Sequence, residues 1–200
     1  MTANFESAEL ALKFWRLLYQ TYTLRKQSED QIFEEHGLTT EQFGVLVTIG
    51  FFGSPVKPTE IAKWLARSPN SISMIVDRMV KAGLVRRVRS TGDRREVRVF
   101  ITSKAENALK PATLASLEFI RKILSPLSNE DRRTLISLLG TLKSEILKYL
   151  NPEVDIEETT RNESERQGNM REWLLKYTLP STPQAKRQGG KKRKTKKKTE

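Results

Sequence analysis

The chain has 200 residues and a formal net charge of +12, with no cysteine and a single histidine, His36. The lack of cysteine excludes disulfides, thiolate metal sites and cysteine nucleophiles, and one histidine disfavours a histidine-built metal site or catalytic triad. This length suits one ordinary domain with appendages, and the positive charge suits a polyanionic partner such as nucleic acid or an anionic membrane surface.

The first 36 residues carry the pattern of one long amphipathic helix. Apolar residues recur at helical spacing from Phe5 to Tyr22, and Gly37 is well placed to end the helix. An apolar stripe with this many aromatic residues needs another surface to cover it. Two interpretations stay open at this point: packing within the same chain, or an interface between two subunits.

Two further helices are expected between residues 40 and 67. Thr40 is a candidate N-cap for the first of them. Residues 50–58 contain two glycines and two prolines, so they predict a turn. Pro58 then opens the second helix, with Glu60 near its positive end. The expected buried positions are Phe43, Leu46, Val47, Ile49, Ile61, Ala62 and Leu65.

The next helix has well-marked ends and is predicted over residues 69–82. Ser68 is the expected N-cap, Pro69 takes the first helical position, and Gly83 ends the helix. One face is polar. The other is apolar, and its expected members are Ile72, Ile75, Val76, Met79 and Val80.

Alternating residues in segments 84–89 and 94–101 flank a turn that contains Gly92, which predicts a β-hairpin. Asp93, at that turn, is expected to orient a neighbouring arginine through a charge-assisted hydrogen bond. So many arginines on one ribbon repel one another unless an anion relieves them. They are Arg86, Arg87, Arg89, Arg94, Arg95 and Arg98.

Two long helices and a polar tail complete the chain. Thr102 opens the first of these helices, which is expected to reach about Leu124, with Pro111 inside it or at its true start. Ser128 and Asp131 resemble a capping box for the second, which ends near residue 151. Residues 152–200 are polar and then basic, and they are expected to be largely disordered. One short amphipathic segment, with Met170, Trp173, Leu174 and Tyr177, could form a helix that docks on the body or on a partner.

The order of helix, turn, capped helix and basic hairpin is typical of a unit that reads duplex DNA. A helix ~10–12 Å wide fits the major groove, where each base pair shows its own pattern of donors and acceptors. Arginines at a ribbon tip can enter the minor groove, where the potential is most negative. The alternatives are a merely solvated helix face and a generic basic hairpin.

Residues 72–87, followed by Asp93-Arg94-Arg95, Val97, Val99 and Ile101-Thr102, resemble the MarR family of transcriptional regulators. The resemblance covers about residues 5–150. It implies a mainly α fold with a small β-wing, in which a winged helix-turn-helix at 37–102 lies between dimerisation helices at 1–36 and 103–151. The tail at 152–200 is not part of the usual family pattern.

The resemblance also implies a homodimer that binds double-stranded DNA at a pseudo-palindromic operator, acting as a repressor. The implied dimer-interface residues are Phe5, Leu12, Trp15, Leu135, Leu142 and Ile146. The implied recognition-helix residues are Ser68, Asn70, Ser71, Ser73, Met74, Arg78 and Lys81. On the wing they are Arg89, Asp93, Arg94, Arg95 and Arg98.

Members of this family often bind a small phenolic or other anionic effector between the dimer platform and the DNA-binding lobe. Five aromatic residues are candidates to line such a pocket, although ordinary core or interface packing is the favoured interpretation: Trp15, Tyr19, Phe43, Phe51 and Trp64. No cofactor and no metal site are expected.

Three other functions compete with this interpretation. A sequence-tolerant architectural DNA-binding protein would suit the basic tail, where residues 186–198 contain nine Lys and Arg and no acid. An enzyme is disfavoured because neighbouring acids such as Glu34 and Glu35 lack a histidine partner or a phosphate-binding loop. Membrane association would require the tail and the Trp173 segment to act together. We expect a cytoplasmic regulator without catalytic activity.

Overall fold

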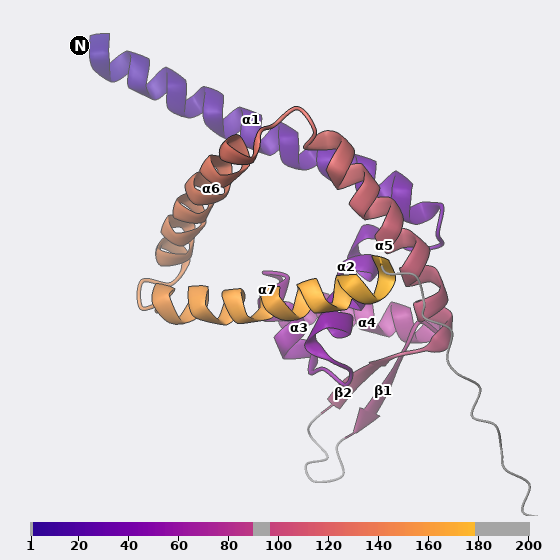
Figure 1. Ribbon diagram of the computed structural model, residues 1–200. Helices are drawn as coiled ribbons and strands as arrows, with labels where there is room; N and C mark the ends of the chain where they lie inside the picture. The colour runs from indigo at the N-terminus through magenta and orange to yellow at the C-terminus, as the bar shows by residue number, and fades with distance from the viewer. Residues whose placement is uncertain (1, 90–96, 179–200) are drawn as a thin grey trace, which may run out of the picture.

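The computed structural model describes residues 2–89 and 97–178, with side chains described within 6–89 and 97–175. These residues form a mostly helical fold with one small antiparallel sheet (Figure 1). In chain order the elements are α1 (Thr2–Glu34), α2 (Thr40–Phe52), α3 (Pro58–Trp64), α4 (Pro69–Lys81), β1 (Val85–Arg89), β2 (Val97–Ile101), α5 (Ser103–Ile123), α6 (Asn129–Leu150) and α7 (Ile156–Thr178). The predicted fold class, mainly α with a β-wing, is confirmed.

Local signals explain most helix ends. Gly37 takes φ +69° just after α1, a backbone conformation that glycine adopts without steric penalty. The cap of α2 is Thr39 rather than the predicted Thr40. The Thr39 hydroxyl oxygen accepts a hydrogen bond from the Gln42 backbone N–H, and the Gln42 side-chain oxygen accepts one from the Thr39 backbone N–H. Both halves of a capping box are therefore present.

The turn predicted for residues 50–58 begins later than expected. α2 continues through Gly50 to Phe52, and the chain turns only at Gly53, where φ is +80°. The helix persists because its last turn is buried: Ile49 is fully enclosed and Phe51 nearly so. Burial of such side chains contributes about 1.5–3 kcal/mol each, more than the ~1 kcal/mol cost of a glycine within a helix.

One hydrophobic core joins α2, α4 and α5. Leu46 and Ile49 of α2 belong to the same buried cluster as Ile72 of α4 and Leu109 of α5. Three predicted core positions, Phe43, Val47 and Leu65, are only partly buried, and Val80 is 39% exposed. Val80 was predicted on the apolar face of α4 and is exposed, whereas its neighbour Met79 is buried.

The hairpin pairs Val85 with Ile101 and Arg89 with Val97 in antiparallel register. Val99 is its buried anchor and also exchanges two backbone hydrogen bonds with Val56, at 3.1 and 2.8 Å, in the segment before α3. The ribbon is thereby fixed to the helices on one side, and its outer strand β1 is exposed from Arg86 to Arg89.

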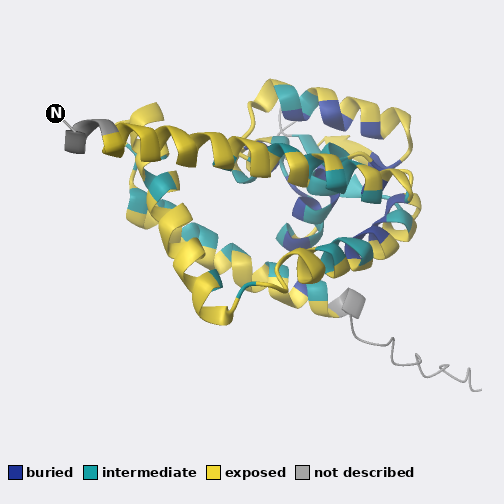
Figure 2. Ribbon diagram, turned by 90° about the horizontal axis from the view of Figure 1, so that it is seen from above, coloured by how far each residue is buried: buried dark blue, intermediate teal, exposed yellow. Residues whose placement is uncertain are grey.

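The long helices form an open frame that extends to one side of the short helices and the sheet. α5, α6 and α7 make three sides, and α1 runs past the corner between α5 and α6 toward its free N-terminal end (Figure 1). Exposed residues dominate α6 and the N-terminal half of α1, whereas buried residues gather in the shorter helices (Figure 2). α6 contains no buried residue.

The polar tail differs from the sequence expectation. Residues 156–178 form one continuous helix, α7, so disorder was wrongly expected for that part of 152–200. The Trp173 segment does dock on the body, as one of the alternatives proposed: α7 packs against α2 and α5, and Trp173 is only 5% exposed. Few apolar residues anchor this helix, which is why its composition resembled that of a disordered segment.

Candidate nucleic-acid interface

α4 has the predicted start and end. The Ser68 hydroxyl accepts from the Ser71 amide at 3.2 Å, Pro69 follows as the first helical residue, and Gly83 has φ +70°. Because the Ser68 oxygen is engaged as the cap, Ser68 positions the helix start in addition to any contact with a partner.

The solvent face of α4 is polar with one large apolar exception. Asn70, Arg78 and Lys81 are exposed, and Met74 is 61% exposed between them. Ser71 and Ser73 are partly buried. Met74 is therefore accessible for contact with a partner, as are the exposed polar residues around it.

Arg87 joins the ribbon to this helix. Its guanidinium is ion-paired with the Asp77 carboxylate on α4, and its other terminal nitrogen donates to the Ser73 carbonyl oxygen at 3.2 Å. Arg86 lies over the Phe100 ring of β2, 4.7 Å from the ring centroid. Arg86 and Arg87 therefore support the ribbon, and sequence reasoning did not separate them from the arginines that face outward.

The remaining wing residues fall into two groups. Arg89 is exposed at the end of β1, and Arg98 is partly buried on β2. Asp93, Arg94 and Arg95 lie outside the described residues, so their expected roles at the wing tip stay predictions.

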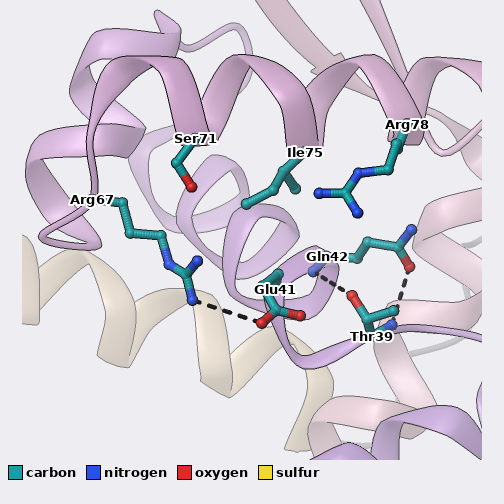
Figure 3. A pocket seen from close by; sticks show the side chains of 7 residues that line it. All are labelled: Thr39, Glu41, Gln42, Arg67, Ser71, Ile75 and Arg78. Carbon is teal, nitrogen blue, oxygen red and sulfur yellow. Dashed lines mark hydrogen bonds and ion pairs between the residues drawn. The ribbon is translucent and has the colours of Figure 1, made fainter.

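A polar hollow of about 380 Å³ lies between α4 and the start of α2 (Figure 3). Arg67 and Arg78 approach it from opposite ends, and Arg67 is ion-paired with Glu41 across 3.7 Å. Arg67 was missed by sequence reasoning, although it directly precedes the cap Ser68. The lining residues are Thr39, Glu41, Gln42, Arg67, Ser71, Ile75 and Arg78.

Asp30 ties α1 to the start of α2. The Thr40 hydroxyl donates to one carboxylate oxygen at 2.5 Å, and the Lys26 ammonium donates to the other at 2.9 Å. These two hydrogen bonds, the first being the larger cause, hold the pKa of Asp30 below its ordinary value. The same bond to Asp30 raises the pKa of Lys26.

The residues proposed for a dimer interface are not buried within their own chain. Leu12 is 72% exposed, Trp15 59%, Leu135 43% and Ile146 40%, and Leu142 is partly buried. The Phe5 side chain lies outside the described residues.

The five aromatic candidates for a ligand pocket do not come together. Trp15 and Tyr19 are exposed on the projecting part of α1, Phe43 stacks on Phe33, and Phe51 packs edge-to-face on Trp64. The five residues therefore share no lining within one chain, and their expected role in a ligand pocket stays a prediction.

Another hollow, of about 570 Å³, lies beside α1 and α2. Phe43 is the only one of the five aromatic candidates that lines it, together with Tyr22, Phe33, Arg25 and Arg67. Glu29 and Glu41 also line it and are ion-paired with Arg25 and Arg67, so its charges are balanced. Its aromatic rings suit contact with a small aromatic molecule.

The residues that the structure describes indicate neither a metal site nor a membrane span. Within 2–89 and 97–178, no group of three or more His, Asp or Glu side chains is placed to hold a metal ion. None of the helices described is both long and apolar enough to cross a bilayer.

A capped helix with a polar outer face, joined by an arginine fork to an antiparallel ribbon, defines a winged helix-turn-helix protein of the DNA-binding class. The chain belongs to the MarR family of transcriptional regulators. The family's sequence profile matches residues 36–96. Regulators of this family are DNA-binding proteins rather than enzymes.

Two curated relatives support this assignment. The HTH-type transcriptional regulator MgrA of Staphylococcus aureus is 30% identical over 129 residues, which cover 62% of this chain and 86% of MgrA. The HTH-type transcriptional regulator PecS of Dickeya dadantii is 29% identical over 120 residues, covering 59% of this chain and 72% of PecS.

Solved structures establish the same fold. A mutant of MarR from E. coli, complexed with operator DNA, matches with a TM-score of 0.60 at 20% identity, over 66% of this chain and 94% of that one. The S. aureus MepR–DNA complex matches with a TM-score of 0.62 at 22% identity, over 66% and 97%. The organohalide-sensing regulator RdhR-CbdbA1625 in its 2,4-dichlorophenol-bound form matches with a TM-score of 0.66 at 23% identity, over 70% and 83%.

Proposed function

We propose that this regulator is a repressor that binds a pseudo-palindromic operator as a homodimer and releases it when a small aromatic ligand binds. The observation that carries the proposal is the single surface formed by α4 and β1, joined through Arg87 and Asp77. That surface presents a helix face sized for the major groove beside an exposed cationic strand.

On this surface we assign some side chains to contacts with DNA bases and others to contacts with the DNA backbone. Asn70, Ser71, Ser73 and Met74 lie in the first turns of α4, where a recognition helix reaches base edges. Arg78 and Lys81, near its end, suit phosphates. Arg89, Arg98 and the wing-tip residues Asp93, Arg94 and Arg95 would follow the minor groove and its flanking phosphates.

The homodimer is supported by apolar side chains that a single chain leaves exposed. On α1 they include Leu10 at 67%, Leu12 at 72% and Tyr19 at 69%; on α6 they include Ile136 at 72% and Leu138 at 62%. Large apolar side chains exposed in this number on two helices favour association with a partner surface. A second copy interlocked through α1 and α6 would bury it and place two recognition helices about 34 Å apart, one turn of B-DNA.

Repression would follow from occlusion of a promoter by the bound dimer. For relief by a ligand, we propose the hollow lined by Phe43, Tyr22, Arg25 and Arg67, rather than the five aromatic residues that the sequence suggested. RdhR-CbdbA1625, of similar fold, was solved with a chlorinated phenol. A ligand bound between α1 and α2 would shift the equilibrium between lobe orientations by its differential affinity for them.

Selection of bound sequences from a random duplex pool tests the proposal, followed by the mass of the complex in solution. We expect enrichment of a two-fold symmetric site and two chains per duplex. A monomeric complex, or a pool without an enriched site, would overturn it.

A sequence-tolerant architectural protein remains the second candidate, favoured by the nine cationic residues in 186–198. The ratio of affinities for the selected site and for random duplex, at one salt concentration, decides between the two. A specific regulator should show a ratio of at least about 10³.

A further inference from the structure

α7 connects the outer frame to the DNA-binding part of the molecule. It follows α6 after a short turn and returns across α2 and α5 (Figure 1). Near its C-terminal end Trp173 is buried, and Met170 and Leu174 pack against the same core. The helix is therefore fixed on the lobe by its far end and attached to α6 by its near end.

Gly50 makes the Trp173 contact close. A Cβ atom at residue 50 would lie 2.6 Å from the indole Cε2 and closer still to Nε1, well inside contact distance. The indole thus lies directly on the backbone of α2. The otherwise unfavourable glycine within that helix has a packing reason, because any larger residue would displace Trp173.

Two charged contacts brace the rest of α7. The Arg166 guanidinium lies 4.7 Å from the Phe52 ring centroid and 5.9 Å from that of Trp64, so it caps the aromatic cluster at the end of α2. Glu163 is ion-paired with Lys143 of α6, which holds the corner between α6 and α7. Both ends of the connection are therefore constrained.

We propose that Trp173, seated on Gly50, is a positioning residue for DNA binding: through α7 it fixes the orientation of the lobe relative to α6. This inference rests on the proposed function, in which α6 belongs to the dimer interface and each lobe reads one half-site. In such a dimer the α7 contact sets the separation of the two recognition helices.

The contact on α2 is transmitted to α4 because the two helices share one core. Ile49, adjacent to Gly50, is buried in the same cluster as Ile72 and Ile75 of α4. Densely packed cores move as units rather than deforming continuously. When Trp173 holds α2, it also holds the recognition helix.

The experiment measures the preference for half-site spacing. Binding constants are determined for the selected operator and for versions with one base pair inserted or removed between the half-sites. The full-length variants are Gly50→Ala and Trp173→Ala, with Trp173→Phe as the conservative variant. Gly168→Ala on α7 is the matched control, since Gly168 is exposed and a Cβ there meets nothing within 4 Å. Hydrogen exchange over residues 156–175 reports whether α7 stays docked.

In the wild type and in Gly168→Ala we expect the changed half-site spacing to weaken binding by roughly 100-fold. In Gly50→Ala and Trp173→Ala we expect the α7 amides to lose protection from hydrogen exchange. The loss of affinity on changing the half-site spacing should shrink to about threefold, and affinity for the parent operator should be roughly tenfold lower. Trp173→Phe should restore most of the spacing preference. Trp173→Ala leaves the α2 backbone unchanged, so it keeps the test valid if Gly50→Ala misfolds.

The proposal is overturned if α7 undocks but the loss of affinity on changing the half-site spacing stays as large as in the wild type. In that case affinity falls by the same factor for every spacing. This result would make the contact merely structural. A wild-type protein without any spacing preference would instead contradict the two-half-site function, so the two failures are distinguishable.

Discussion

The Arg87 guanidinium on β1 is ion-paired with the Asp77 carboxylate on α4, and it also donates to the Ser73 carbonyl oxygen. The planar guanidinium of Arg87 thus fixes the angle between the ribbon and the recognition helix. The pair also neutralises a carboxylate that would otherwise face phosphates. The two side chains are 32% and 55% exposed, so the contribution of the pair to stability is modest. In the proposed complex we expect its larger effect to be on DNA binding.

Replacement of Arg87 tests this linkage. In Arg87→Ala we expect the free energy of unfolding to fall by about 0.5–1 kcal/mol and DNA affinity to fall roughly tenfold, because Asp77 is left uncompensated and the wing is released. Urea denaturation and fluorescence anisotropy measure the two effects.

Asp77→Asn in the Arg87→Ala background is the control. Removal of the uncompensated carboxylate should recover part of the reduced affinity. Wild-type affinity in the single Arg87→Ala variant would show that the fork has no role in binding.

Met74 is expected to read base identity. An exposed apolar side chain in the major groove contacts the thymine methyl group, so Met74→Ala should weaken discrimination at one A·T pair. Because Met74 is 61% exposed, the melting temperature should stay unchanged. Selection of bound sequences measures the preference at each position.

Lys81→Ala is the contrasting variant. Without the Lys81 ammonium on a phosphate, binding should weaken equally for all sequences. The salt slope, which is the dependence of the logarithm of the binding constant on the logarithm of the salt concentration, should fall in magnitude by about 1. If Met74→Ala behaved in the same way as Lys81→Ala, Met74 would have no part in base readout.

Local signals in the sequence were sufficient for α4. Ser68, Pro69 and Gly83 lie within one turn of the ends they set, and their effect does not depend on the rest of the fold. The cap of α2 was misassigned between two adjacent threonines, although Gln42 lies three residues after Thr39 and so marks the correct one.

Long-range packing determined what the sequence could not predict. Gly50 resembled a turn residue, and its contact with Trp173 joins segments far apart in the chain. Likewise, Trp64 and Tyr19 are of the same chemical kind, yet the fold places one against Phe51 and leaves the other exposed on α1.

Asp30 predicts a pH dependence of stability. Its pKa in the folded protein is lowered by the hydrogen bonds from Thr40 and Lys26, so its contribution is complete above the ordinary carboxyl pKa of about 3.9. The contribution is lost as the pH falls through the lower, folded-state pKa. Asp30→Asn should therefore destabilise the protein at pH 7, with the difference disappearing at strongly acidic pH.

Thermal unfolding of both proteins across this pH range measures the effect. Exposed Glu130→Gln is the control and should show little change. A constant difference between wild type and Asp30→Asn at every pH would contradict the assigned role of the carboxylate.

Deletion of residues 180–200 removes nine cationic residues within 186–198. We expect weaker binding to all duplexes and a salt slope smaller by about 0.9 for each phosphate that the tail no longer neutralises. Base preference should be unchanged, because phosphate contacts carry no direct sequence information. A changed selected sequence would contradict this role for the tail.

Hydroxyl-radical footprinting on the selected operator tests the central claim most directly. If α4 and the arginine ribbon form one duplex-reading surface that is duplicated in a dimer, the backbone protections will be two-fold symmetric. Their two halves will be centred about 10 base pairs apart. A single unsymmetric protected patch, or uniform protection along the duplex, would contradict the claim.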